Sequence, residues 1–139
     1  MDKKKWIVIA VAVLLALTAV LLIIQRTIPM ELSDLMPEGF QPEQCRVLYS
    51  DWMDSMELTE AELQTLLTHL ESLEYRYDGR VPGGIMTGKL YHLSFFQPKP
   101  DGLVNIFVTT RLGIVYMNDR EYEMLGDTKP LLEFLGQLK

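Results

Sequence analysis

The chain is poor in the side chains that most often carry enzyme chemistry. Its 139 residues include two histidines and one cysteine. A single cysteine excludes an internal disulfide, so the fold must rest on its hydrophobic core. Neither histidine stands beside the cysteine, and no serine lies in a nucleophile-elbow sequence. Because a catalytic site needs a base, a nucleophile or a metal within reach of one another, we expect a protein that is not an enzyme.

Positive charge is scarce in the C-terminal part of the chain. From residue 27 onward, nine Lys and Arg stand against eighteen Asp and Glu, a net charge of minus nine. This balance repels nucleic acid and anionic lipid headgroups, because both are negatively charged. The sequence therefore predicts no nucleic-acid partner, and no motif in it calls for a cofactor.

One long apolar run organises the N-terminal part of the chain. The run begins at Trp6 and ends at Ile24, and its nineteen residues include no charged side chain. At about 1.5 Å per residue, a helix of this length just crosses the roughly 30 Å hydrocarbon core of a bilayer. A single segment in lipid must satisfy its own backbone hydrogen bonds, which only a helix does. We predict a transmembrane helix.

The flanking charges predict the orientation of this helix. Lys3, Lys4 and Lys5 precede the run, whereas Arg26 alone follows it. Lys and Arg near the ends of a span are retained on the cytoplasmic side. We expect a single-pass type II anchor in the cell membrane, with residues 1–26 forming a cytoplasmic stub and the span, and with the C-terminal part extracytoplasmic.

A cleaved signal peptide is the alternative for the same segment. The apolar region of a signal peptide is usually 7–15 residues long and ends in small residues of the A-x-A type. Ala10 and Ala12 form that pattern where the run has barely begun, and the run then continues to Ile24. These features favour an uncleaved signal anchor.

Beyond the span, the chain divides into a connecting segment and one small domain. Residues 27–44 contain three prolines and a glycine among acidic residues and follow neither helix nor strand periodicity. We interpret them as a stalk. The apolar side chains between Met30 and Phe40 indicate that part of the stalk packs on the domain or on a partner. Residues 45–139 suffice for a domain that folds independently.

Two amphipathic helices are predicted in this domain. Thr59 and Glu62 form a capping box, and a stripe of leucines at 3.6-residue spacing follows it: Leu63, Leu66, Leu67, Leu70 and Leu73. The second helix covers residues 127–138, with Asp127 or Thr128 as its cap and Pro130 in its first turn. Each apolar stripe must cover an apolar surface.

The domain also shows the two-residue alternation of β-strands. We expect strands over residues 45–52, 90–96, 103–109 and 112–116, and a short edge strand over 121–125. The links between the later strands are short, and only antiparallel strands can be joined in that way. The predicted fold is α+β, with two helices packed on one side of a four- to five-stranded antiparallel sheet.

No metal site is predicted. Asp51, Asp54 and Glu57 stand at three-residue spacing, but an EF-hand loop needs oxygens at alternating positions, then Gly and Glu. His69 has no second ligand three or four residues away. We interpret the acidic residues as a solvated turn and His69 as a surface residue.

One glycine-rich segment resembles a nucleotide-binding motif. Gly83, Gly88 and Lys89 stand at the spacing of a P-loop, in which Ser or Thr follows the lysine and a helix begins. Leu90 occupies that position instead, and a strand pattern follows it. We predict no nucleotide site and interpret residues 78–89 as a flexible connection before a hairpin.

Aromatic residues of the sheet indicate where a partner binds. We expect one buried and one solvent-exposed face, with Tyr91, Phe95 or Phe96, Phe107 and Tyr116 available to the exposed one. Exposed aromatic residues beside charged ones are typical of protein interfaces, although the same residues can equally belong to the core. The sequence thus favours a membrane-anchored extracytoplasmic binding module.

Two other functions stay open. The apolar stalk suits an accessory or assembly subunit that docks to a larger membrane complex. Cys45 and His92 would suit a small hydrolase if the thiol and the imidazole met across the sheet. The simpler interpretation makes Cys45 a small apolar strand residue and His92 a polar residue on the exposed face.

In the order of its elements, the domain resembles small, uncharacterised extracytoplasmic domains of Gram-positive bacteria that are tethered by one N-terminal span or a lipid. The likeness covers residues 45–139 and rests on the capped helix LTEAELQTLLTHLESL, the glycine-rich loop, the strand YHLSFF, the hairpin LGIVYMNDREYEML and the terminal leucine helix. The resemblance implies architecture and a location at the membrane, and it implies no activity.

Overall fold

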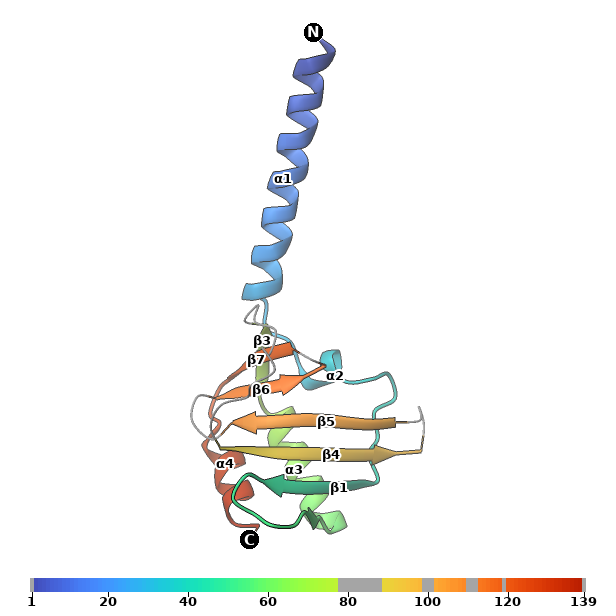
Figure 1. Cartoon of the computed structure of the whole chain (residues 1–139), viewed down its shortest axis with the longest axis vertical. Helices are drawn as coiled ribbons and strands as arrows, with labels where there is room; N and C mark the ends of the chain where they lie inside the picture. Colours follow the sequence, from blue (N-terminus) through green and yellow to red (C-terminus); the bar gives the residue numbers. More distant parts are fainter. Residues whose placement is uncertain (1, 78–88, 99–101, 110–112, 119, 139) are drawn as a thin grey trace.

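A computed structural model of the chain describes residues 2–77, 89–98, 102–109, 113–118 and 120–138, except for the side chains of residues 25–27. Helix α1 (Lys3–Thr27) projects from a domain that holds all the other elements (Figure 1). Its 25 residues extend about 37 Å. Lys3–Ile24 is long and apolar enough to cross a membrane, and it is not buried against the domain. A cleavable signal sequence near an N-terminus meets the same criteria of length and composition.

Seven strands form one antiparallel sheet within the described residues, in the order β2-β1-β4-β5-β6-β7-β3. Their bounds are Gln44–Tyr49 (β1), Met56–Glu57 (β2), Glu74–Tyr77 (β3), Leu90–Gln97 (β4), Gly102–Thr109 (β5), Ile114–Met117 (β6) and Arg120–Leu125 (β7). The predicted meander is confirmed for β4 to β7, because each of these strands pairs with the next in the chain. The sheet stands with β7 and β3 next to α1 and with β1 far from it (Figure 1).

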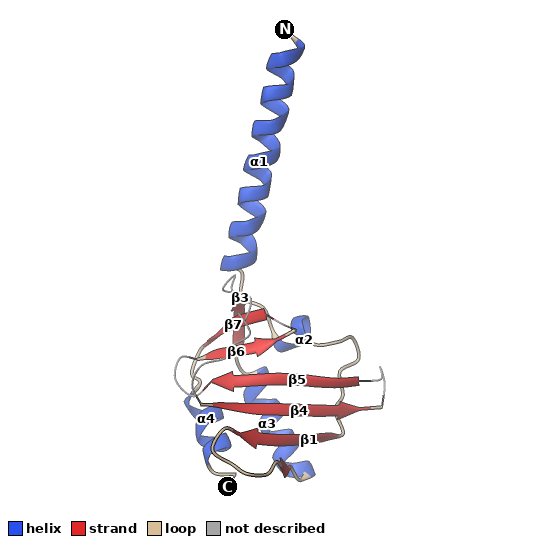
Figure 2. Cartoon of the chain, in the orientation of Figure 1, coloured by secondary structure: helices blue, strands red, loops and turns tan. Residues whose placement is uncertain are grey.

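In the described part of the chain, three further helices accompany the sheet: α2 (Leu32–Leu35), α3 (Glu60–Glu71) and α4 (Lys129–Gly136). Figure 2 shows α3 and α4 behind the sheet, with the opposite face turned toward the viewer. Buried leucines of both helices, such as Leu66 and Leu135, belong to the same core as the sheet. The structure therefore has a helix-covered face and, in the part of the chain that it describes, a face without helices.

The capped helix forms as the sequence predicts. Thr59 Oγ1 accepts a hydrogen bond from the Glu62 backbone N–H at 3.2 Å, and Glu62 Oε1 accepts one from the Thr59 N–H at 2.9 Å. Leu63, Leu66 and Leu70 are buried on the face that follows. Burying a leucine side chain contributes about 1.5–3 kcal/mol, so packing of this face, more than the cap, holds α3 on the sheet.

The covered face of the sheet is the centre of the core. Alternate residues of the central strands point toward the helices and are completely buried: Cys45, Val47, Leu93, Phe95, Ile106, Val108 and Val115. The register places these side chains directly opposite one another, since Cys45 pairs with Phe95 and Leu93 with Ile106. One continuous apolar layer therefore runs across four strands.

The predicted numbers of strands and of domain helices are wrong: among the described residues the domain has seven strands and three helices, not four to five strands and two helices. Strand β2 has two residues and β3 has four, too few for a two-residue alternation to identify them. Strand β3 pairs with β7, from Glu74 opposite Leu125 to Tyr77 opposite Tyr122. The segment that we predicted as an edge strand thus lies inside the sheet.

The segment predicted as a stalk packs on the domain, which was one of the two expectations for it. Leu32, Leu35 and Met36 are buried in the domain core. The backbones of Met30 and Tyr75 exchange two hydrogen bonds of 2.8 Å. On the turn after β6, Asn118 has a positive φ of 52°, and its side-chain amide donates to the Leu35 carbonyl at 2.7 Å. These contacts fasten the segment that follows α1 to the domain, at strand β3 and at the turn after β6.

Candidate interaction surface

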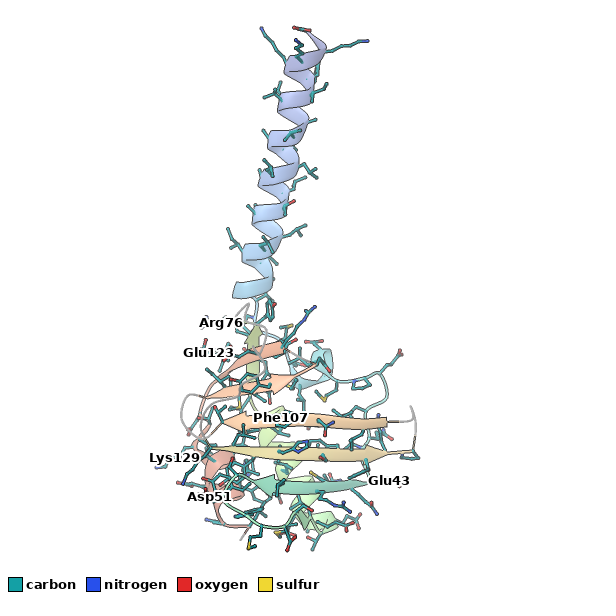
Figure 3. The ribbon with its side chains drawn as sticks, viewed as in Figure 1. Glu43, Asp51, Arg76, Phe107, Glu123 and Lys129 are labelled. Atoms are coloured by element: carbon teal, nitrogen blue, oxygen red, sulfur yellow. The ribbon has the colours of Figure 1, made fainter. Side chains whose placement is uncertain are left out.

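We call the sheet face without helices the open face. It is formed by the side chains that alternate with the buried ones on β1, β4, β5 and β6: Arg46, Leu48, His92, Ser94, Phe96, Leu103, Asn105, Phe107 and Tyr116. The register aligns His92 with Phe107, and Phe107 with Tyr116. Figure 3 shows Phe107 on β5, on the side turned toward the viewer.

Large apolar side chains are exposed on the open face. Leu103 is 51% exposed, and its register partner Phe96 is 38% exposed, as is Leu48. Beyond Ile28, the described residues hold four exposed large apolar side chains, and the fourth, Met53, lies outside the strands. The open face therefore concentrates the exposed apolar area of the domain.

Three half-buried polar side chains form a hydrogen-bonded cluster between these apolar residues. His92 Nε2 lies 2.8 Å from Asn105 Oδ1 and 3.2 Å from Ser94 Oγ, and Ser94 Oγ donates to the same Asn105 oxygen at 3.2 Å. A carbonyl oxygen only accepts hydrogen bonds, so this arrangement makes His92 Nε2 a donor. With its proton directed at the Asn105 amide oxygen, His92 Nε2 does not accept the proton of Ser94 in this arrangement.

Contacts between aromatic rings, and between a ring and a cation, hold four side chains of the open face in place. The rings of His92 and Phe107 are stacked, with 4.3 Å between centroids and 12° between planes. The Arg46 guanidinium lies over the Phe96 ring, 5.8 Å from its centroid. A cation over an aromatic ring contributes about 0.5–1 kcal/mol at exposed sites. These contacts hold the aromatic and cationic groups of the open face in position before any partner protein binds.

The structure separates the aromatic residues that the sequence grouped together. Phe96, Phe107 and Tyr116 lie on the open face. Tyr91 lies on the covered face, where its ring stacks on Tyr49 with 4.5 Å between centroids, and burial raises the pKa of its hydroxyl. The spacing could have shown this, because residues an odd number of positions apart in a strand point to opposite faces.

Cys45 and His92 do not meet. Cys45 points into the core, and His92 belongs to the open face. Burial raises the pKa of the Cys45 thiol to about 12, which suppresses the thiolate that a nucleophile requires. The pairing on which the hydrolase alternative was based is therefore absent.

The structure describes part of each of the two sequence patterns that were compared with ligand sites, the acidic turn and the P-loop-like segment. Asp51 forms a salt bridge of 2.6 Å with Lys89. Leu90 begins strand β4, whereas a helix would follow the lysine of a P-loop. Gly83 and Gly88 lie outside the described residues. No group of three or more His, Cys, Asp or Glu side chains that could hold a metal occurs among the residues that the structure describes.

Sequence reasoning did not select Arg46, Ser94 and Asn105 as site residues. Ser94 stands two positions from His92, and the symmetric antiparallel pairing of β4 with β5 places Asn105 opposite Ser94. That symmetry was the signal that could have found the cluster. None of the protein-family models, curated proteins or solved structures compared with the chain matches it. The resemblance to extracytoplasmic domains of Gram-positive bacteria stays a prediction.

Proposed function

We propose that the chain is a single-pass membrane protein whose extracytoplasmic domain binds a protein partner through the open face and catalyses no reaction. In this proposal α1 is retained as a type II anchor, with Lys3, Lys4 and Lys5 in the cytoplasm. The observation that carries the proposal is the uncovered sheet face, where exposed apolar side chains surround polar groups that are already bonded to one another.

This arrangement lowers the cost of covering the open face. Removal of apolar area from water favours association by about 25 cal/mol per Å², and Leu48, Phe96 and Leu103 supply that area. Covering a polar group that already has a partner costs less than covering an unpaired one. The stacked His92 and Phe107 rings also need little further ordering on binding.

The partner that fits this surface is a protein with apolar side chains and at least one carboxylate. The apolar side chains would contact Phe96 and Leu103, which are paired on the adjacent strands β4 and β5. A carboxylate would pair with Arg46, whose planar guanidinium suits bidentate hydrogen bonds. Arginine and aromatic side chains are also the residues on which binding energy most often concentrates.

Neither alternative function has a comparable observation in its favour. The apolar residues of the supposed stalk, such as Leu32 and Met36, are buried in the domain itself, so they no longer argue for docking to a membrane complex. A hydrolase would have to do without Cys45, because the thiol is buried on the covered face.

The proposal is tested by crosslinking in intact cells followed by identification of the proteins captured with the chain. Leu103→Glu places a charge at the most exposed apolar position of the open face. Met53→Glu is the matched control, since Met53 is 98% exposed and lies in the loop between β1 and β2, outside the strands that form that face. We expect Leu103→Glu to reduce capture of the partner by roughly tenfold or more, equivalent to about 1.4 kcal/mol, and Met53→Glu to leave it unchanged. Equal capture by the two variants would contradict the proposal.

A further inference from the structure

A hollow lies where the end of α1 meets the edge of the sheet. Its volume is about 330 Å³, and its walls are formed by Ile24, Ile28, Met30, Tyr77, Arg120 and Tyr122. We call it the junction pocket. The first three residues come from the last turns of α1 and the segment after it, and the others come from β3 and β7. In Figure 1 these two strands are the part of the sheet next to α1.

The polar side of the junction pocket combines one cation with two tyrosines. The Arg120 guanidinium lies over the Tyr77 ring, 5.5 Å from its centroid, and is hydrogen-bonded to Tyr122. Among the described residues, Arg120 forms no salt bridge with a carboxylate. Burial raises the pKa of Tyr122, and Arg120 acts in the opposite direction. The hydroxyl therefore keeps its proton at neutral pH.

The other side of the junction pocket is continuous with the apolar surface of α1. Ile24 ends the apolar run and Ile28 caps the helix, and both side chains are exposed. In a membrane this level is the boundary between hydrocarbon and headgroups, where tyrosine and tryptophan rings collect. Trp6 stands at the opposite end of the run. The junction pocket thus joins an apolar wall to a cationic one at the depth of the lipid phosphates.

We infer that the junction pocket binds a phospholipid of the outer leaflet, with Arg120 on the phosphodiester and the upper part of an acyl chain against Ile24 and Ile28. Guanidinium groups bind phosphate oxygens through paired, charge-assisted hydrogen bonds. The site depends on α1 staying in the membrane, and so on the anchoring part of the proposed function, but it does not depend on the open face.

The charge of the domain selects the class of lipid. Residues 27–139 carry a net charge of minus nine, which repels anionic headgroups as they approach. A zwitterionic headgroup avoids this repulsion, and its phosphate still contacts Arg120 at short range, where salt screens less. Phosphatidylethanolamine has this chemistry and is the probe that we choose.

The test is native mass spectrometry of the full chain in detergent micelles, titrated separately with phosphatidylethanolamine, dioleoylglycerol and inorganic phosphate. The variant is Arg120→Gln. Arg46→Gln is the matched control, since Arg46 also lies over an aromatic ring but belongs to β1, far from α1 (Figure 1). We expect the wild-type chain and Arg46→Gln to retain phosphatidylethanolamine, and Arg120→Gln to bind it roughly tenfold more weakly, the factor that 1.4 kcal/mol produces.

Three results would overturn the inference. Equal retention by both variants would remove the role of Arg120. Retention of dioleoylglycerol as strong as that of phosphatidylethanolamine would show a purely apolar contact. Binding of inorganic phosphate that blocks the lipid would identify a site for free phosphate.

Two controls distinguish a loss of lipid binding from misfolding of the variant and from failure of α1 to anchor the chain in the membrane. Arg120→Lys keeps the charge but loses the planar pair of donors, so we expect it to bind the lipid with a strength between those of wild type and Arg120→Gln. Flotation of every variant with liposomes reports on α1. Loss of flotation would refute the anchor and the lipid site together, whereas loss of lipid binding with normal flotation would refute the lipid site alone.

Discussion

Two neighbouring residues of β4 show how differently the two faces of this sheet are used. Phe95 is completely buried and packs edge-on against Phe40, with 5.7 Å between ring centroids. Phe96 is exposed on the open face and lies beneath the Arg46 guanidinium. Successive side chains of a strand point in opposite directions. One residue type therefore builds the core at one position and offers a binding surface at the next.

The largest expected difference between the faces comes from truncating these two phenylalanines. Phe95→Ala should lower the free energy of unfolding by about 3–5 kcal/mol, because it opens a cavity in the core. Phe96→Ala should cost less than about 1 kcal/mol and should weaken partner capture. Urea unfolding of both variants measures the difference. Similar losses of stability would mean that the open face is part of the core.

Two tyrosines extend the comparison to hydrogen bonds. The buried Tyr75 hydroxyl donates to the Leu70 carbonyl at 2.7 Å and ties the end of α3 to β3. Tyr75→Phe removes this bond and leaves the Leu70 carbonyl with only the backbone N–H groups at the end of α3, such as that of Leu73 at 3.4 Å, which should cost about 0.5–1.5 kcal/mol. Tyr116→Phe changes a 3.5 Å contact with Glu121 on the open face and should cost less. The order of the two unfolding midpoints checks this prediction, and the reverse order would contradict it.

The polar cluster predicts a smaller effect within the open face. Asn105→Ala removes the acceptor that His92 and Ser94 share, and we expect a loss of about 1 kcal/mol. Ser94→Ala leaves the bond between His92 and Asn105 intact and should cost less. Thermal unfolding of the two single variants and the double variant tests the coupling. Strictly additive losses would show that the three side chains do not act as a cluster.

The smallest effect on stability at neutral pH should come from ionisation of the Cys45 thiol, and this effect should grow as the pH rises. Burial raises the pKa of this thiol from its ordinary value of 9.0 to about 12. The unfolded chain therefore loses the proton first as the pH rises, so the contribution to stability is complete below pH 9 and is lost between 9 and 12. Stability measured across this range should fall less steeply in Cys45→Ala. Parallel curves would contradict the burial of the thiol.

The elements that sequence reasoning found are those specified by neighbours in the chain. The cap of α3 lies within four residues, and the β4–β5 hairpin joins adjacent strands. Strand β3 depends on pairing with β7, about 50 residues later. Its four residues are too few for a two-residue alternation of apolar and polar side chains to predict a strand. The faces of the sheet were harder still, because aromatic residues occur on both and only the position of the helices decides which is covered.

The most direct test of the central claim compares two single-cysteine variants in a Cys45→Ala background. Met53→Cys reports whether the domain lies outside, and Leu103→Cys reports whether the open face is covered, since both positions are exposed in the isolated chain. Intact cells are treated with a membrane-impermeant maleimide. We predict that Met53→Cys is labelled and Leu103→Cys is protected, and that both are labelled after purification. Labelling of neither before lysis would place the domain in the cytoplasm, and equal labelling of both in intact cells would show that no partner covers the open face.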